Sequence, residues 1–147
     1  MITLEECYGK GLLRKVDPST GKARDSLRQA RTWLQEAGQA FAAGALRSAL
    51  LAVYNGYFHA ARAILFRDGV REKSHYCIEL YLGSYVSGGL LEAEWIAMFG
   101  RMRNARHTDQ YSFHPAPSRE EVESAIKGGG RFIDRMEHLL EESPPRR

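Results

Sequence analysis

The sequence contains little cysteine and no apolar run long enough to cross a membrane. Its two cysteines, Cys7 and Cys77, are too few for a disulfide framework. Cys77 falls in an apolar helical pattern, where we expect a buried free thiol. Arg47 and Arg62 flank the longest apolar stretch, and the first ten residues lack the apolar segment of a signal peptide. We therefore expect a soluble, cytoplasmic protein that does not associate with membranes.

The common signatures of metal and cofactor sites are also missing. None of the five histidines belongs to an HExxH motif, and no Cys-x-x-Cys pair occurs. His75 and Cys77 lie two positions apart, a spacing that does not place them on one helix face. The glycines near residue 9 and at 128–130 do not follow a strand pattern, so neither group predicts a phosphate-binding loop. We expect neither a metal nor a cofactor.

Apolar residues recur at helical spacing, and no segment alternates as a convincing strand would. Helices are predicted over about 21–43, 45–66, 75–86, 91–110 and 119–142, with Ser74 and Ser118 capping the third and fifth. Glycines 128–130 inside the fifth helix indicate either a kink or the close approach of another backbone. At 147 residues the chain predicts one all-α, up-and-down bundle of four or five helices. The bundle is expected to span 19–142, after an N-terminal extension (1–18) and before a disordered tail (143–147).

The end of the fourth predicted helix is the strongest candidate for a functional site. Arg103, His107 and Tyr111 follow one another at i, i+4 and i+8, so we expect them to stack on one helix face. Asn104 lies on the flank of that face. Arginine holds phosphate through paired hydrogen bonds, and histidine can transfer a proton near neutral pH. Together they are the minimum for metal-free cleavage of RNA, in which the 2′-hydroxyl of the substrate attacks.

Other arginines extend this basic region. Arg101 and Arg106 border the same face, and Asp109 is the only acid among them. Arg62 is a charge within an otherwise apolar helix, so its guanidinium requires a partner or a path to solvent. The alternative to a phosphate site is a solvated basic face or a docking surface for an acidic partner.

Three segments together resemble the HEPN (higher eukaryotes and prokaryotes nucleotide-binding) superfamily. They are YNGYFHAARAILFRDGVREKSH (54–75), a Gly-Gly break (88–89) and a helix that ends RMRNARHTDQY (101–111). The resemblance covers about residues 20–140 and implies a helical bundle of HEPN type. It also implies a homodimer in which the motif helices of both subunits meet at a composite cleft. Many members are metal-independent endoribonucleases, often toxins beside a nucleotidyltransferase antitoxin.

The hallmark of that superfamily is an arginine, a polar residue and then a histidine four to six positions later, and it can be placed here in three registers. Arg101 has the right distance to His107, but Met102 follows it. Arg103 is followed by the polar Asn104, but only three residues separate it from His107. If Arg106 and His107 are the arginine–polar pair, Tyr111 occupies the position of the histidine.

These observations support two hypotheses. In the first, the protein is an RNA-processing HEPN domain, a ribonuclease toxin in which Arg101, Arg103 and His107 are catalytic. The residues expected to bind RNA or nucleotide are Asn104, Arg106, Tyr111 and Arg62. In the second, the same bundle is a non-catalytic module that binds nucleotide, RNA or a nucleotidyltransferase partner.

Overall fold

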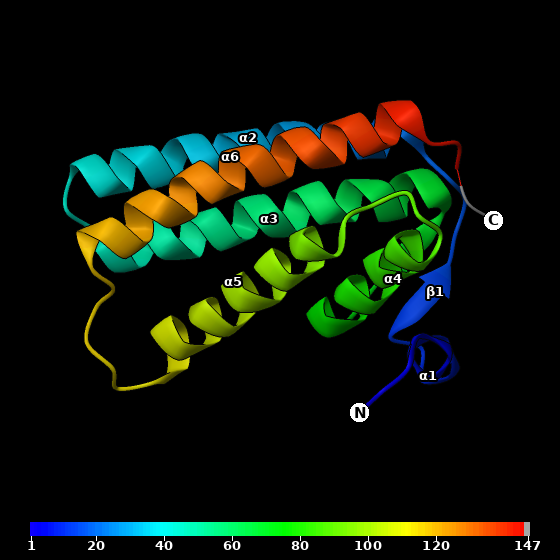
Figure 1. Ribbon diagram of the computed structural model, residues 1–147, viewed down its shortest axis with the longest axis horizontal. Helices are drawn as coiled ribbons and strands as arrows, with labels where there is room; N and C mark the ends of the chain where they lie inside the picture. Colours follow the sequence, from blue (N-terminus) through cyan, green and yellow to red (C-terminus); the bar gives the residue numbers. More distant parts are fainter. Residues whose placement is uncertain (146–147) are drawn as a thin grey trace.

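The structure, a computed structural model, describes residues 1–145 and is built almost entirely of helices (Figure 1). In chain order the elements are α1 (Leu4–Gly9), β1 (Leu13–Lys15), α2 (Thr20–Ala42), α3 (Leu46–Asp68), β2 (Val70–Glu72), α4 (His75–Ser87), α5 (Ala93–Tyr111) and α6 (Arg119–Glu142). The predicted all-α bundle is confirmed, and its five helices correspond to α2–α6. Within the described part of the chain, no helix is long and apolar enough to span a membrane.

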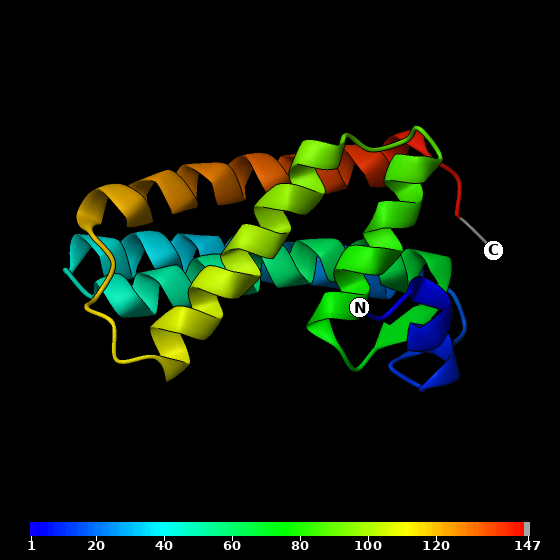
Figure 2. The same ribbon diagram turned by 60° about the horizontal axis from the view of Figure 1, so that its bottom comes forward.

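Helix α3 is the centre of the bundle because apolar side chains surround it. Val53, Tyr57, Ala60 and Ile64 are all at most 2% exposed. Helices α2 and α6 lie along one side of α3, and α4 and α5 cover the opposite side (Figures 1 and 2). Figure 2 shows that α5 crosses the bundle obliquely, so its C-terminal half diverges from α4.

The three consecutive glycines of α6 permit close packing and do not kink the helix. Helix α6 is continuous from Arg119 to Glu142. A Cβ at Gly128 would lie 3.1 Å from the hydroxyl oxygen of Tyr57, and one at Gly129 would lie 3.0 Å from Cδ1 of Leu34. The sequence left open a kink or the close approach of another backbone. The glycines instead admit side chains of α2 and α3, so the expected backbone contact is wrong although the packing is close.

The N-terminal segment differs from the prediction, because it forms a strand and a disulfide bond. Strand β1 pairs antiparallel with β2, although no strand was expected. Strands of three residues are too short for an alternating pattern to be recognised. Gly69 leads into β2 with a φ of 77°, and a Cβ there would lie 2.5 Å from the carbonyl oxygen of Val16. Only glycine fits this turn.

Cys7 of α1 and Cys77 of α4 are joined, with 6.0 Å between their Cα atoms. Both residues are fully buried, so the prediction of a buried Cys77 is confirmed and that of a free thiol is wrong. The bond links segments that are 70 positions apart. Leu4, Tyr8, Leu12 and Leu13 are spaced as in a short helix that packs on the body, but no sequence pattern indicated α4 as the neighbour of α1.

The residue that follows α6 is buried and hydrogen-bonded to Arg67 of α3. Ser143 is only 6% exposed, and its carbonyl oxygen accepts a hydrogen bond of 2.7 Å from Nη1 of Arg67. The same nitrogen donates to the carbonyl oxygen of Leu140. Arg67 of α3 therefore holds the residue that follows α6, and the disorder expected for 143–147 stays a prediction. Residues 146 and 147 lie outside the described residues.

Candidate functional site

Helix α5 divides its polar side chains between two environments. Phe99 and Met102 face the core, and successive residues of a helix are turned by about 100°. Arg103 and Arg106 therefore lie beside the core and reach toward α4 and α3. Four other predicted site residues are exposed on the outer side of the helix: Arg101, Asn104, His107 and Tyr111.

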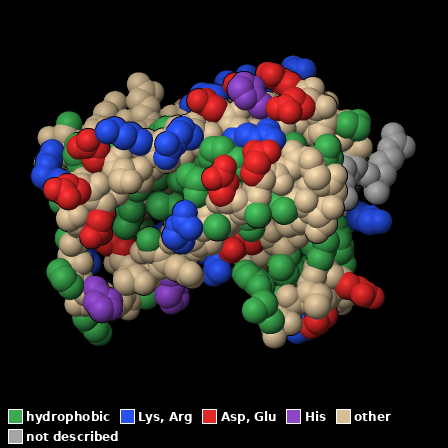
Figure 3. Space-filling model, viewed as in Figure 1, with side chains coloured by type: hydrophobic (Ala, Val, Ile, Leu, Met, Phe, Trp, Pro, Cys, Tyr) green, Lys and Arg blue, Asp and Glu red, His purple; other side chains and the backbone are tan. Residues whose placement is uncertain are grey.

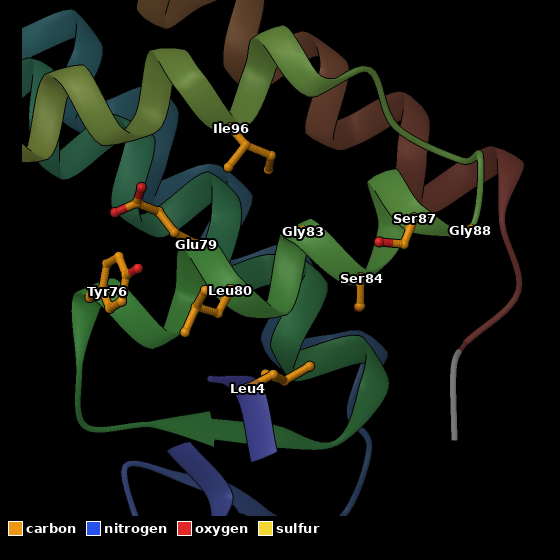
Figure 4. A pocket seen from close by; sticks show the side chains of 9 residues that line it. All are labelled: Leu4, Tyr76, Glu79, Leu80, Gly83, Ser84, Ser87, Gly88 and Ile96. Atoms are coloured by element: carbon orange, nitrogen blue, oxygen red, sulfur yellow. The ribbon is translucent and has the colours of Figure 1, made fainter. Parts of the chain in front are cut away.

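Arg103 is engaged by Glu79 of α4. Its Nε lies 2.5 Å from Oε2 of that carboxylate, and its guanidinium carbon lies 5.2 Å from the ring centroid of Tyr76. Gly100 makes room for the pair, because a Cβ there would lie 2.7 Å from Oε1 of Glu79. Figure 4 shows Glu79 and Ile96 facing the space between α4 and α5. Arg103 therefore fastens the two helices together.

Arg106 packs on the ring of Tyr54, with 4.9 Å between its guanidinium carbon and the ring centroid. Its Nη1 donates to Oε1 of Gln110, whereas its Nε is buried without a hydrogen-bond partner. Among residues 1–145, no carboxylate lies within 4.0 Å of this guanidinium. Arg106 is thus a half-buried cation whose charge has no direct counterpart.

His75 and Tyr54, which were not among the predicted site residues, form a pair beside Arg106. The hydroxyl of Tyr54 lies 2.6 Å from Nδ1 of His75, and Phe58 stacks on the imidazole with 4.4 Å between ring centroids. Burial lowers the pKa of His75, and the charges of Arg106, Arg103 and Arg62 lower it further. Burial raises the pKa of Tyr54 to about 12. Both residues lie in the segment 54–75 that carries the family resemblance, which gave the only signal and assigned neither of them a role.

Arg62 has the partner that its position in an apolar helix requires. Its Nε lies 2.8 Å from Oε1 of the buried Glu72, and its guanidinium carbon lies 4.8 Å from the ring centroid of Phe66. It also lies over the ring of Phe58, which stacks on His75. The structure thus gathers Arg62, Arg103 and Arg106 around one histidine.

The exposed side of α5 keeps the remaining predicted residues together. The rings of His107 and Tyr111 are in contact, with 5.1 Å between centroids. The predicted stack is therefore present between these two residues, while Arg103 turns away to Glu79. Arg101 and Asn104 border a hollow of about 540 Å³ between α4 and α5. In the part of the chain that the structure describes, no group of three or more metal-ligating side chains occurs.

That hollow continues into a second one along α4. The second has a volume of about 800 Å³ and shares Glu79, Gly83 and Ile96 with the first. Its other lining residues in Figure 4 come from α1, α4 and the turn that follows α4: Leu4, Tyr76, Leu80, Ser84, Ser87 and Gly88. A mostly apolar groove therefore runs beside Arg101 and Asn104.

Comparison with known proteins agrees with this fold. A family model described as "HEPN domain" matches residues 23–139, which include all of α3, α4 and α5. A protein of Methanocaldococcus jannaschii named "Putative toxin MJ0605" is 30% identical over 97 residues, which are 65% of this chain and 72% of the relative. The family match extends over most of the bundle and contains all of the candidate site residues on α3, α4 and α5. The chain belongs to the HEPN domain family.

Proposed function

We propose that this HEPN protein is a metal-independent endoribonuclease in which Arg101 and His107 perform the chemistry. The observation that carries the proposal is that the three arginines of α5 lie in different environments. Arg103 is bound to Glu79, and Arg106 is packed on Tyr54. Arg101 and His107 are exposed and lie five intervening residues apart, which is the spacing of the family hallmark. The structure thus favours the first of the three possible registers.

The chemistry required of these side chains is limited. His107 accepts the proton of the ribose 2′-hydroxyl as its oxygen attacks the adjacent phosphorus, and a 2′,3′-cyclic phosphate forms as the 5′-oxygen leaves. The leaving oxygen takes up a proton from a second acid or from water. Arg101 stabilises the negative charge that grows on the phosphorane, and Asn104 and Tyr111 orient the phosphate or ribose. These roles follow the residues' chemistry and the family resemblance.

A second copy of the chain would complete this site. Arg101 and His107 are separated by about 9 Å along the helix axis, at a rise of 1.5 Å per residue. In a two-fold dimer built on α5, Arg101 of one subunit can meet His107 of the other. The apolar groove beside Arg101 and Asn104 offers the surface for such a contact. We therefore propose a homodimer with a shared cleft.

The relative named as a toxin supports a toxin role for this chain as well, paired with an antitoxin such as a nucleotidyltransferase. Expression of the wild-type protein in a bacterial host should then arrest growth. His107→Ala should relieve the arrest at equal protein levels. Growth arrest that persists in this variant would contradict the link between toxicity and the proposed site.

The activity is tested directly by incubating purified protein with RNA in excess EDTA. Wild type should cleave, and His107→Ala should cleave at least about a hundredfold more slowly. His138→Ala is the matched control, because His138 is an exposed histidine on α6, away from α5. Equal absence of cleavage by wild type and His107→Ala would end the proposal.

Mixing two inactive variants tests the shared cleft. When Arg101→Ala and His107→Ala subunits are exchanged, each mixed dimer regains one intact site if the two residues come from different subunits. About a quarter of wild-type activity should then return, because half of the dimers are mixed. No recovery after proven exchange would place both residues of a site in one subunit.

A non-catalytic binding module is the second candidate, and the residue after Arg101 favours it. The hallmark has a polar residue there, whereas Met102 is apolar and 9% exposed. A module of this kind would bind nucleotide, RNA or a nucleotidyltransferase through the same basic helix. Binding of RNA at low salt without cleavage, weakened equally by Arg101→Ala and His107→Ala, would identify it.

A further inference from the structure

We propose that the N-terminal segment and β2 form a docking surface for an acidic peptide segment of a protein partner. Cations of the two-stranded β1–β2 ribbon bind its carboxylates, and an adjoining hollow takes an apolar side chain. The surface lies at the other end of the molecule from the C-terminal end of α5 (Figures 1 and 2). Strand β1 also precedes the residues that the family model matches, 23–139. The surface therefore goes beyond the proposed function and does not depend on RNA cleavage.

The ribbon places two positive charges against each other. Arg14 of β1 lies directly opposite Arg71 of β2. Side chains of such a pair share one face of the ribbon, and like charges in this arrangement are destabilising. Neither arginine has a carboxylate within 4.0 Å among residues 1–145. An anionic partner would supply the charge that this pair lacks.

Three exposed lysines extend this positive surface: Lys10, Lys15 and Lys73. They too form no ion pair in the part of the chain that the structure describes. The acids of the same segments do not balance them. Glu72 is buried and paired with Arg62, and Asp17 is the single exposed acid of 10–17 and 70–73. Five exposed cations thus lie beside one exposed acid.

A mostly apolar hollow of about 660 Å³ adjoins the ribbon. Its apolar walls come from α1, from the residue after β1 and from β2: Leu4, Val16 and Val70. Lys15 lies at the same hollow, and the neighbouring Val16 is 42% exposed. Asp68 also borders it, but the Asp68 side chain is fully buried and paired with Arg67. Figure 3 shows hydrophobic side chains (green) gathered on this lobe, at the lower right.

The hollow is formed before any partner binds. Leu4 and Tyr8 of α1 form one wall, and the disulfide bond between Cys7 and Cys77 fixes α1 on α4. A preformed site loses less conformational entropy on binding. An apolar anchor surrounded by a polar rim is typical of protein–protein interfaces. Interfaces with nucleic acid are more polar, so a strand of nucleic acid would leave the hollow unfilled.

The peptide is found by selection from a random library displayed on phage, with the purified full chain as the target at low salt. We expect the selected peptides to carry an apolar residue flanked by aspartate or glutamate. Selected peptides without an excess of acidic residues, or a selection that yields no binding peptide, would overturn the proposal.

Fluorescence anisotropy then measures the affinity of variants for one selected, labelled peptide. Arg14→Thr and Arg71→Thr should each weaken binding about fivefold, the effect of one exposed charge pair. Arg24→Thr removes an exposed cation of α2 and is the matched control, with unchanged affinity expected. Because each ribbon variant relieves the like-charge contact, its Tm should equal or exceed that of wild type. Unchanged affinity in both variants, or weaker binding that accompanies a lower Tm, would overturn the proposal.

Val16→Lys separates an apolar anchor from a purely electrostatic contact. This variant adds a positive charge but removes part of the apolar wall, so peptide binding should fall about tenfold. Tighter binding of the peptide would show that charge alone attracts it, and would overturn the assignment of the hollow. Single-stranded DNA is titrated in parallel. DNA that binds wild type more tightly than the peptide does, and loses affinity in Arg71→Thr, would assign the ribbon to nucleic acid and overturn the proposal.

Discussion

Arg103 and Glu79 form the ion pair that fastens α5 to α4, with 2.5 Å between Nε and Oε2. The two side chains are only 26% and 12% exposed, so removal of one charge leaves the other poorly hydrated. We expect Arg103→Gln to lower the free energy of unfolding by about 1–3 kcal/mol, measured by urea denaturation. The matched control is Arg28→Gln, which breaks a highly exposed pair with Asp25 and should cost less than about 1 kcal/mol. Equal losses in the two variants would contradict a structural role for Arg103.

Two adjacent glycines of α6 should respond to alanine in opposite ways. A Cβ at Gly129 would lie 3.0 Å from Cδ1 of Leu34 and 3.4 Å from Cγ1 of Val53, so Gly129→Ala crowds the core. We expect a loss of about 1–3 kcal/mol. At Gly130 the nearest atom would lie at 3.7 Å, an ordinary contact, so Gly130→Ala should stabilise the helix by up to about 1 kcal/mol. Thermal unfolding measures the change in Tm for both variants. Changes of the same sign in Gly129→Ala and Gly130→Ala would show that packing does not decide the effect.

Reduction of the disulfide bond should destabilise the protein. Cys7 and Cys77 close a loop of 70 positions, and the chain-entropy model assigns about 4 kcal/mol to a loop of that length. A thiol reductant should therefore lower the Tm by on the order of 10 °C. The double variant Cys7→Ala/Cys77→Ala should unfold at the lower temperature with and without reductant. A wild-type Tm that does not respond to reductant would contradict a stabilising bond.

Stability should fall on mild acidification, and His75 should account for part of the fall. Its pKa in the folded protein lies below the ordinary value of 6.5, because it is buried and faces Arg106, Arg103 and Arg62. Just below pH 6.5 the unfolded chain therefore binds more protons than the folded one. The contribution of His75 to the free energy of unfolding is therefore complete above about pH 6.5. It declines as the pH falls through that value toward the lower pKa of the folded protein.

Urea denaturation at several pH values in this window measures the slope of the free energy of unfolding against pH. His75→Gln should flatten it, and the slope that remains reflects His59, whose pKa burial also lowers. His138→Gln removes an exposed histidine of α6 and should leave the slope as in wild type. A His75→Gln variant as acid-sensitive as wild type would contradict this assignment.

The helices could be predicted from the sequence because their apolar spacing and caps are local. Ser74 accepts from the amide of Cys77, and Ser118 accepts from the amide of Glu121, as expected. The candidate site could be predicted only as a stretch of α5. Whether Arg103 faces His107 or Glu79 depends on the crossing of α5 over α4, which no local pattern encodes. For the same reason the partnership of Tyr54 with His75, 21 positions away, was not foreseen.

The most direct test of the proposed site compares two arginines of α5 in one assay. Initial rates of RNA cleavage in EDTA are measured for Arg101→Ala and Arg103→Gln, at a temperature where both variants are folded. We predict that Arg101→Ala loses at least about a hundredfold in rate while Arg103→Gln stays within about threefold of wild type. Loss of activity in Arg103→Gln with retention in Arg101→Ala would contradict the assignment of the catalytic register.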